Sequence, residues 1–379
     1  MRKISVYTRD TQIGSSSYYR IWQYFNRMGN QYKIRDRSFV PGSITRLQYN
    51  YSNNKGIIGI LVKLIYHMFV YLGSILFFMI DIIDTPNAVV ILRSITPKTY
   101  KFPVNLLYRK LLEKTKIVIW DFDDNIFVNN EISDNEKELL EKKATYIIVT
   151  HEYLRSLLSK KYRDKTILMP TTEGDFSGLN FNEIIKKRID DYDSIRMVWL
   201  ASSAGLKDIE FISEELEQAA IILRKSYNKQ LTLTIVCNKM PCIKSKVLKI
   251  QFCPWTRSKA IDELIKSHFG IMPLIDNEFS KGKGGFKIIQ YMAAGLPQIA
   301  SAVGFNNTVI DEGISGCLVN DNTEKQKWVE SIVLLSTNME KWKMMSYNSI
   351  QRWNTNFSFE RNLHTWMELL DGIKTEKET

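Results

Sequence analysis

The sequence has few cysteines and none of the spacings that cysteines take in metal sites. Its four cysteines include no Cys-x-x-Cys pair, and no zinc-ligand spacing is present. We therefore expect buried free thiols in a reducing compartment. There is also no internal repeat and no low-complexity tract. The N-terminus runs directly into a strand-like segment, so we expect no signal peptide.

Acidic residues are scarce at the start of the chain. Up to residue 60 the sequence has ten lysines and arginines but only two aspartates, and the whole 379-residue chain carries a formal charge of +11. Such an excess favours an anionic partner. No RNP-like or other nucleic-acid recognition motif accompanies it, so we expect no nucleic-acid partner. An anionic membrane surface fits better.

The segment 56–83 is the most apolar stretch. Its longest run without a full charge, 64–80, is broken only by His67. As a helix this run would reach roughly 26 Å, short of the hydrocarbon core of about 30 Å. We expect one or two helices that dip into a membrane face, with a buried core helix pair as the alternative.

Strand-like and helix-like segments alternate along the rest of the chain, as in doubly wound α/β domains. Composition is globular, and 379 residues are enough for two domains. A first set of buried strands ends near Pro170, and a second begins at Arg196. The polar segment Thr171 to Asp191 between them is typical of an interdomain linker.

A glycine-rich turn with two lysines opens a short helix in the second half. The run Lys281-Gly-Lys-Gly-Gly-Phe-Lys predicts a helix that starts near Gly284 and stops at Gly295. Lys283, Lys287 and Gln290 would share one helical face. Free N–H groups, the positive end of the helix dipole and two lysines together predict a phosphate site. A solvated basic turn before a core helix is the alternative.

An acidic cluster, Asp121-Phe-Asp-Asp124, directly follows the predicted strand Lys116 to Trp120. Carboxylates at the carboxyl end of a parallel strand lie where such folds bind ligands. The residues alone leave three interpretations: a metal-binding Asp-x-Asp, a phosphatase-like nucleophile that lacks the usual Gly-Thr, or aspartates that cap the next turn.

The run from Phe286 through Gly295-Leu-Pro-Gln-Ile-Ala-Ser-Ala-Val-Gly304 to Val319 resembles the donor-binding signature of family 4 glycosyltransferases. Motif, order and spacing agree over more than thirty residues. The resemblance implies a retaining enzyme of the GT-B fold: α/β, with two Rossmann-like doubly wound domains that face a central cleft. Residues 1–178 would bind the acceptor, 192–352 the nucleotide sugar, and the helix 353–379 would return to the first domain.

The resemblance also implies roles for individual residues. Asp121, with Asp123 and Asp124, would stand where many members carry a histidine that points at the donor sugar. The small-residue turn at Gly14 and Ser15 would lie near the leaving phosphate and the acceptor. The donor diphosphate and base would be held by residues of the second domain: Lys207, Trp255, Lys283, Gly284, Gly285, Phe286, Lys287 and Gln290.

The sequence departs from the family at its Glu-x7-Glu pair. The first glutamate would fall at Gly282 and the second at Gln290, which can still accept a hydrogen bond but carries no charge. This departure leaves open a catalytically silent subunit that binds a carbohydrate or a partner transferase. Sugar-nucleotide epimerases share the fold and are a minor third possibility.

The resulting prediction is a retaining glycosyltransferase that needs no metal or cofactor beyond its nucleoside diphosphate sugar co-substrate. Asp121, Asp123, Asp124, Lys207 and Lys287 are the predicted catalytic residues. The acceptor would be a lipid-linked or cell-surface polysaccharide. The protein would be cytoplasmic and peripheral on the inner face of the cell membrane.

Overall fold

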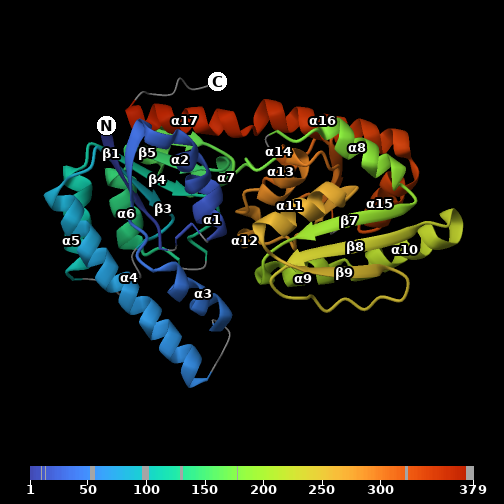
Figure 1. Cartoon of the computed structure of the whole chain (residues 1–379), viewed down its shortest axis with the longest axis horizontal. Coiled ribbons are helices and arrows are strands. Elements are labelled where there is room, and N and C mark those ends of the chain that lie inside the picture. Colours follow the sequence, from blue (N-terminus) through green and yellow to red (C-terminus); the bar gives the residue numbers. More distant parts are fainter. Residues whose placement is uncertain are drawn as a thin grey trace. The chain divides into compact units, whose positions relative to one another are not determined.

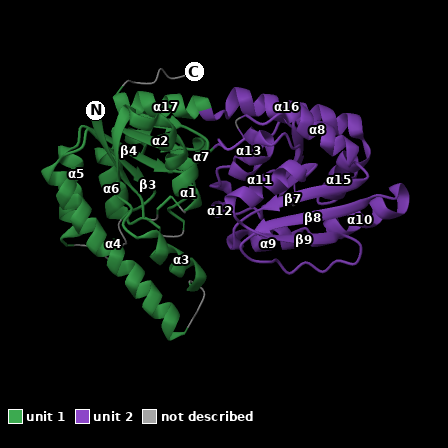
Figure 2. Cartoon of the chain, in the orientation of Figure 1, with its two compact units in different colours: residues 1–171, 360–379 green, residues 172–359 purple. Residues whose placement is uncertain are grey.

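The computed structural model describes residues 1–9, 11–12, 14–51, 56–95, 102–128, 131–176, 178–320 and 323–372. The chain divides into two compact units (Figure 2). Unit 1 comprises Met1–Thr171 with Glu360–Thr379, and unit 2 comprises Thr172–Phe359. The C-terminal segment therefore belongs to the same unit as the N-terminus.

Unit 1 is built on a six-stranded, all-parallel sheet with the order β2-β1-β3-β4-β5-β6 (Figure 1). The order reverses between β1 and β3, which makes that point the topological switch of the sheet. Its strands are β1 (Arg2–Tyr7), β2 (Tyr32–Asp36), β3 (Ala88–Leu92), β4 (Ile117–Phe122), β5 (Tyr146–Val149) and β6 (Thr166–Leu168).

The helices of unit 1 include one long helix, α4, where the sequence allowed one or two. They are α1 (Ser15–Ser17), α2 (Gln23–Met28), α3 (Gly42–Tyr51), α4 (Ile57–Ile83), α5 (Val104–Lys114), α6 (Asp134–Lys143), α7 (Glu152–Ser156) and α17 (Phe359–Asp371), with a π-helical turn, η1 (Tyr18–Trp22), between α1 and α2.

Helix α17 is fastened to unit 1 by both polar and aromatic contacts. The side chain of Asn362 donates to the hydroxyl of Tyr24 over 3.0 Å, and the Trp366 and Phe25 rings meet edge to face at 5.3 Å. Arg2 pairs with Asp371 at 2.8 Å. Helices α2 and α17, far apart in the sequence, thus contribute to one core.

Unit 2 has a second all-parallel sheet with the order β12-β11-β10-β7-β8-β9, the doubly wound order of a Rossmann domain. The switch point lies between β7 and β10. Its strands are β7 (Ser194–Leu200), β8 (Gln230–Cys237), β9 (Lys249–Pro254), β10 (Phe269–Met272), β11 (Gln298–Ser301) and β12 (Gly316–Val319). The two sheets confirm the predicted fold class.

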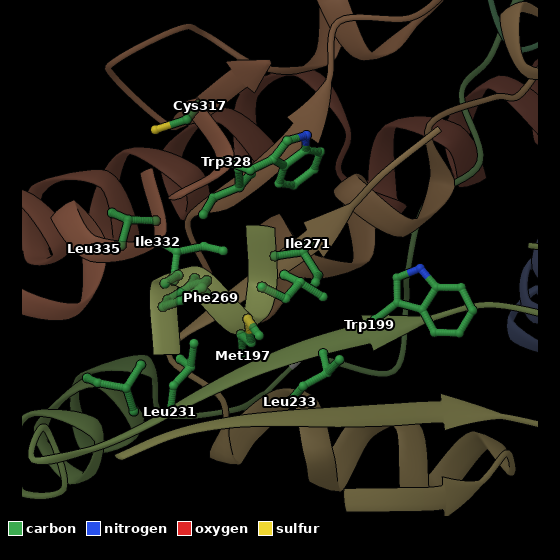
Figure 3. Close-up of a cluster of buried hydrophobic side chains, with 14 of the residues drawn as sticks. Met197, Trp199, Leu231, Leu233, Phe269, Ile271, Cys317, Trp328, Ile332 and Leu335 are labelled. Carbon is green, nitrogen blue, oxygen red and sulfur yellow. The ribbon is translucent and has the colours of Figure 1, made fainter. Parts of the chain in front are cut away.

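Helices pack on both faces of this second sheet. Figure 3 shows one buried cluster, which includes Met197 and Trp199 of β7, Phe269 of β10 and, on α15, Trp328, Ile332 and Leu335. The helices are α8 (Phe181–Asp190), α9 (Leu206–Phe211), α10 (Ser213–Tyr227), α11 (Arg257–Lys266), α12 (Glu278–Lys281), α13 (Phe286–Ala293), α14 (Asn306–Val309), α15 (Lys327–Thr337) and α16 (Met339–Asn356).

Two boundaries differ from those expected. The segment taken as a linker contains α8, whose buried Arg188 donates to the carbonyl oxygens of Leu264 and Ala294, so most of it is part of unit 2. The expected boundary of the C-terminal segment at residue 353 falls inside α16, which runs on to Asn356, while the last helix begins at Phe359. Polar composition suggested a linker in the first case, but the polar side chains cap and fasten a helix.

The cysteines, all within the described residues, are free. Cys237 and Cys317 are buried as expected, whereas Cys242 is exposed and Cys253 half-buried. The expectation of four buried thiols is wrong for Cys242 and Cys253. Cys253 lies on the edge strand β9, and Cys242 lies in the loop before that strand.

Tyr291 of α13 connects that helix to the switch point of unit 2. Its hydroxyl accepts from the backbone N–H of Leu200 on β7 over 3.1 Å and donates to the carbonyl oxygen of Ile271 on β10 over 3.2 Å. Its ring covers Gly270, where an added Cβ would lie 2.3 Å from Cδ2 of Tyr291. The missing side chain at Gly270 therefore sets how closely α13 approaches the sheet.

We expect Gly270→Ala to destabilise the protein by about 2–3 kcal/mol, because the backbone and the buried ring cannot both stay in place. The measurement is urea unfolding. Gly313→Ala is the control: its φ of +72° is unfavourable for alanine, but nothing lies within 4 Å of the added Cβ. The control should cost about 1 kcal/mol. Equal losses for both variants would contradict the proposed packing constraint.

Candidate functional site

The glycine-rich turn lies at the carboxyl edge of the sheet in unit 2, beside the switch point. It follows α12, which comes after β10, and leads into α13. Gly285 has a φ of +62° and precedes the first residue of the helix, Phe286. The helix thus starts two residues after the predicted Gly284, within the usual uncertainty of a helix end. Its first turn presents N–H groups that a helix does not satisfy internally.

The turn that follows β11, at Gly304 and Phe305, packs closely against the glycine-rich turn. Gly304 has a φ of +56°, and an added Cβ there would lie 2.6 Å from the carbonyl oxygen of Lys281. A Cβ on Gly285 would approach the Phe305 ring to 3.2 Å. Close packing between the two turns, rather than flexibility, is what these glycines provide.

Lys283 is directed toward α9 and not along α13. Its ammonium pairs with Asp208 at 3.1 Å, and the other carboxylate oxygen of Asp208 accepts from the backbone N–H of Ile275. Lys207, which precedes Asp208 in the sequence, is exposed. The expectation that Lys283 shares a helical face with Lys287 is wrong because the helix begins only at Phe286. The structure instead brings Lys283 to the residue beside Lys207.

Lys287 and Gln290 do share a helical face, and a third residue joins them. The ammonium of Lys287 donates to Oε1 of Gln290 over 3.2 Å, and Nε2 of Gln290 donates to Oε2 of Glu173 over 2.8 Å. The backbone N–H of Asp175 donates to the remaining oxygen of Glu173 over 3.0 Å. We call these three side chains, Lys287, Gln290 and Glu173, the relay.

Burial shifts the pKa of both ends of the relay toward neutrality. Glu173 is fully buried, and desolvation, with a smaller contribution from the charge of Asp175, raises its pKa to about 7. Desolvation lowers the pKa of Lys287 to about 8, against the opposing charge of Glu173. Sequence reasoning missed Glu173 because it stands in the segment taken as a linker.

The other predicted donor-site residues are spread over unit 2. Trp255 directly follows β9 and is half-buried. Its backbone N–H donates to the carbonyl oxygen of Cys237 over 3.0 Å. Phe286 is half-buried, with the ammonium of Lys287 5.2 Å from its ring centre. Gly284 and Gly285 are buried in the turn. The structure therefore places Phe286 with the relay and Trp255 at a separate strand end.

Unit 1 holds the remaining predicted residues. Gly14 is buried and immediately precedes α1, while Ser15 is exposed at its first position. The hydroxyl of Ser16 donates to Asp123 over 3.3 Å. The small-residue turn and the acidic cluster therefore lie side by side at the carboxyl ends of β1 and β4.

Both carboxylate oxygens of Asp121 are engaged by a buried arginine. Nε of Arg20 donates to Oδ1 over 2.9 Å, and Nη2 donates to Oδ2 over 2.5 Å. Neither side chain is accessible to solvent. Burial raises the pKa of Asp121, and the guanidinium opposes that rise. The structure thus gives Asp121 a charge partner 101 positions away, which no sequence spacing indicated.

Asp123 and Asp124 share a second arginine at the end of β3. Arg93 donates to Asp123 over 2.8 Å, also pairs with Asp124, and lies 3.5 Å from Glu131. Its φ of +56° is rare outside glycine, and its backbone is held by Trp120 and Asp121. Although burial acts to raise it, the guanidinium groups of Arg93 and Arg20 hold the pKa of Asp123 below its usual value.

This cluster therefore balances carboxylates against guanidinium groups at the switch point of unit 1. Within the described ranges, no group of three or more His, Cys, Asp and Glu side chains could hold a metal ion. The turn-capping interpretation of the aspartates does not describe Asp121, whose two oxygens both accept from a side chain.

A comparison with known protein families matches the part of the chain that carries the glycine-rich turn. Residues 198–338, which contain the glycine-rich turn and α13, match the family model for group 1 glycosyl transferases. The match covers less than half of the chain. No curated protein matches the chain in sequence.

Several solved structures share the fold over nearly the whole chain. HepE of Anabaena in complex with UDP-glucose has a TM-score of 0.66 at 11% identity, covering 98% of this chain and 100% of that chain. Sucrose-phosphate synthase of Thermosynechococcus elongatus has a TM-score of 0.62 at 13% identity (98% and 99%). A glycosyltransferase of Rickettsia africae has a TM-score of 0.61 at 15% identity (99% of both). The chain has the GT-B fold.

We expect Asp121→Asn to cost about 3–5 kcal/mol of stability, because it removes the counter-charge that the buried Arg20 guanidinium contacts directly. The measurement is urea unfolding. Glu152→Gln, which breaks an exposed pair with Arg155, is the control and should cost less than about 0.5 kcal/mol. The double variant Arg20→Met/Asp121→Leu should be more stable than Asp121→Asn. A double variant that is less stable would argue against desolvation as the dominant cost.

Proposed function

We propose that the protein is a retaining glycosyltransferase that transfers a sugar from a nucleoside diphosphate sugar to a lipid-linked or cell-surface polysaccharide acceptor. The observation that carries the proposal is the glycine-rich turn at the switch point of unit 2, inside the segment that matches the group 1 model. Its N–H groups and lysines are suited to an anion.

The chemistry that these residues would perform is stabilisation of the leaving diphosphate. As the glycosidic bond breaks, negative charge grows on the phosphate. The first turn of α13, Lys287 and the exposed Lys207 would neutralise that charge, in place of a divalent metal. The Asp208 pair would hold Lys283 beside them. The acceptor hydroxyl would attack from the face that the diphosphate leaves, so that configuration is retained.

The residues of unit 1 would serve the acceptor side. Gly14 and Ser15 would approach the acceptor and the leaving phosphate. The contact of Asp121 with the donor sugar remains a prediction. Its buried pair with Arg20 supports a positioning role, in which the ion pair fixes the strand end that carries Asp123 and Asp124.

A catalytically silent subunit is the second candidate. It is favoured by Gly282 and Gln290, which stand where the resembled family carries two glutamates. In that case the turn in unit 2 would bind a carbohydrate or a partner transferase without turnover.

The proposal is tested with the purified chain and a panel of nucleoside diphosphate sugars. We expect one donor to raise the melting temperature and to be slowly hydrolysed, equally with and without EDTA. Replacement of the ammonium in Lys287→Met should lower the turnover about 10²–10³-fold. The control is Lys343→Met, which loses an exposed pair with Glu340 on α16 and should leave the turnover unchanged. Activity lost in EDTA would revive a metal-binding role for the aspartates; no donor binding at all would favour the silent subunit.

We also propose that α4 docks on an anionic membrane surface. The exposed large apolar residues of this helix form a stripe along its whole length: Ile57, Ile58, Ile60, Leu61, Leu64, Ile65, Met68, Leu72, Leu76, Met79, Ile80 and Ile83. Figure 1 shows its N-terminal half extending beyond the strands of unit 1, with α3 alongside. Among the described residues it is the one helix long and apolar enough to cross a membrane.

The other end of α4 is anchored in unit 1, which favours docking over spanning. Asp81 is fully buried and accepts from Arg37 over 2.7 Å and from the hydroxyl of Tyr7 over 2.7 Å. Phe78 and Ile82 are buried beside it. Exposed cationic residues also lie on α3, α4 and α5: Arg46, Lys63, Arg109 and Lys110. An exposed apolar stripe, in a unit that also carries exposed cationic residues, suits a helix that lies in the interface of an anionic membrane.

Loss of three apolar side chains from the stripe should weaken binding to vesicles that contain anionic lipid. For Leu61→Asn, Leu64→Asn and Met68→Asn combined, roughly 1 kcal/mol each gives a loss of about a hundredfold. Sedimentation with vesicles measures it. The same change at the exposed residues Leu334, Met344 and Tyr347 of unit 2 is the control. Equal losses in both triple variants would contradict docking through α4.

A further inference from the structure

A carboxylate from outside α13 lies behind the lysine that would face the donor diphosphate. We infer that Glu173 is a positioning residue that fixes the orientation and the charge of Lys287 through Gln290. The inference rests on the proposed function, since it is the diphosphate of the donor that Lys287 would bind. Glu173 is not a catalytic residue in this account, because it touches only the middle of the relay.

The hydrogen bonds of the relay have one possible direction. The ammonium of Lys287 can only donate, so Gln290 must present its carbonyl oxygen to it. The amide nitrogen of Gln290 then faces Glu173 and must donate. The second oxygen of Glu173 receives the backbone N–H of Asp175. Both oxygens of Glu173 thus face donors, and only an ionised carboxylate accepts from both without leaving a buried proton that has no acceptor.

Burial enforces this direction of the hydrogen bonds. Glu173 and Gln290 are both buried, so a lost hydrogen bond is not replaced by water. The charged and titratable groups with the largest effect on the relay, among the described residues, are Asp175 near Glu173, and Glu173 with the thiol of Cys237 near Lys287. Glu173 is therefore the main anionic group that keeps Lys287 protonated.

The relay is complete in a narrow pH range. Below the pKa of Glu173, about 7, the protonated acid carries a hydrogen that needs an acceptor. Both of its neighbours are donors and cannot accept it. Above the pKa of Lys287, about 8, the lysine loses the charge that the diphosphate needs. We therefore expect nucleoside diphosphate binding to decline as pH rises through about 8.

Exchange of the two side chains tests the direction of the bonds. In Glu173→Gln, the new amide nitrogen faces a donor in either orientation, the amide nitrogen of Gln290 or the backbone N–H of Asp175; if Gln290 turns over, its nitrogen faces the ammonium of Lys287. One bond must break in either case. In Gln290→Glu, two carboxylates face each other. In the double variant Glu173→Gln/Gln290→Glu, every donor again meets an acceptor, and the carboxylate contacts Lys287 directly.

The pKa of Lys287 can be read without a ligand. Trace acetylation across pH, followed by peptide mass spectrometry, reports the fraction of the free amine at each lysine. We expect the pKa of Lys287 to fall below about 8 in Glu173→Gln and to return to at least the wild-type value in the double variant. Glu340→Gln, which removes an exposed carboxylate from unit 2, is the control and should not move it.

Titration with UDP, ADP and GDP at pH 8.5 supplies the second readout. Each unit by which the pKa of Lys287 falls should weaken binding about tenfold at that pH, and the double variant should restore it. If no nucleotide binds any variant, the proposed function fails, while the acetylation result still decides the relay. An unchanged pKa of Lys287 in Glu173→Gln overturns the inference. If Glu173→Gln does not fold, a double variant that folds no better also overturns it.

Discussion

The cost of removing charge from water is the constraint on which both candidate sites depend. Buried ionised groups persist only where an opposite charge and well-placed donors replace the lost hydration. In unit 1 this requirement ties Arg20 to Asp121 and Asp81 to Arg37, so that η1, β4, α4 and the end of β2 are held at fixed positions. In unit 2 it produces the relay, whose two charges are separated by an amide. The two sites differ in how completely their charges are balanced.

The fold and the main features of the donor site could be predicted from the sequence because both are local signals. Continuous apolar strands, alternating with amphipathic helices, specify parallel sheets, and the glycine-rich turn, which follows α12, indicates where α13 begins. Asp121 could also be placed at a strand end. Its partner Arg20 could not, because a contact between residues so far apart depends on the packing of η1 against the sheet. The same limitation hid Glu173, whose contact with Gln290 spans 117 positions.

Charge counting gave a misleading impression of the N-terminal region. At least five of the ten basic residues before position 61 are paired with carboxylates within the described part of unit 1: Arg2, Lys3, Arg20, Arg35 and Arg37. Three of their partners, Asp81, Asp84 and Asp121, come later in the sequence, and the fourth, Asp371, lies in the last helix. A local excess of basic residues is therefore partly neutralised by carboxylates that lie far away in the sequence. The membrane proposal rests instead on the exposed apolar stripe of α4 and on exposed cationic side chains of α3, α4 and α5.

The inclusion of α17 in unit 1 determines the order in which the chain can fold during synthesis. The whole of unit 2, residues 172–359, must be made before the ribosome reaches the helix that completes unit 1. At the usual 5–20 residues per second this delay lasts roughly 10–40 s. During it, Phe25 lacks the ring of Trp366 and Tyr24 lacks the amide of Asn362. Unit 2, although second in the sequence, is therefore the first part of the protein whose core can close.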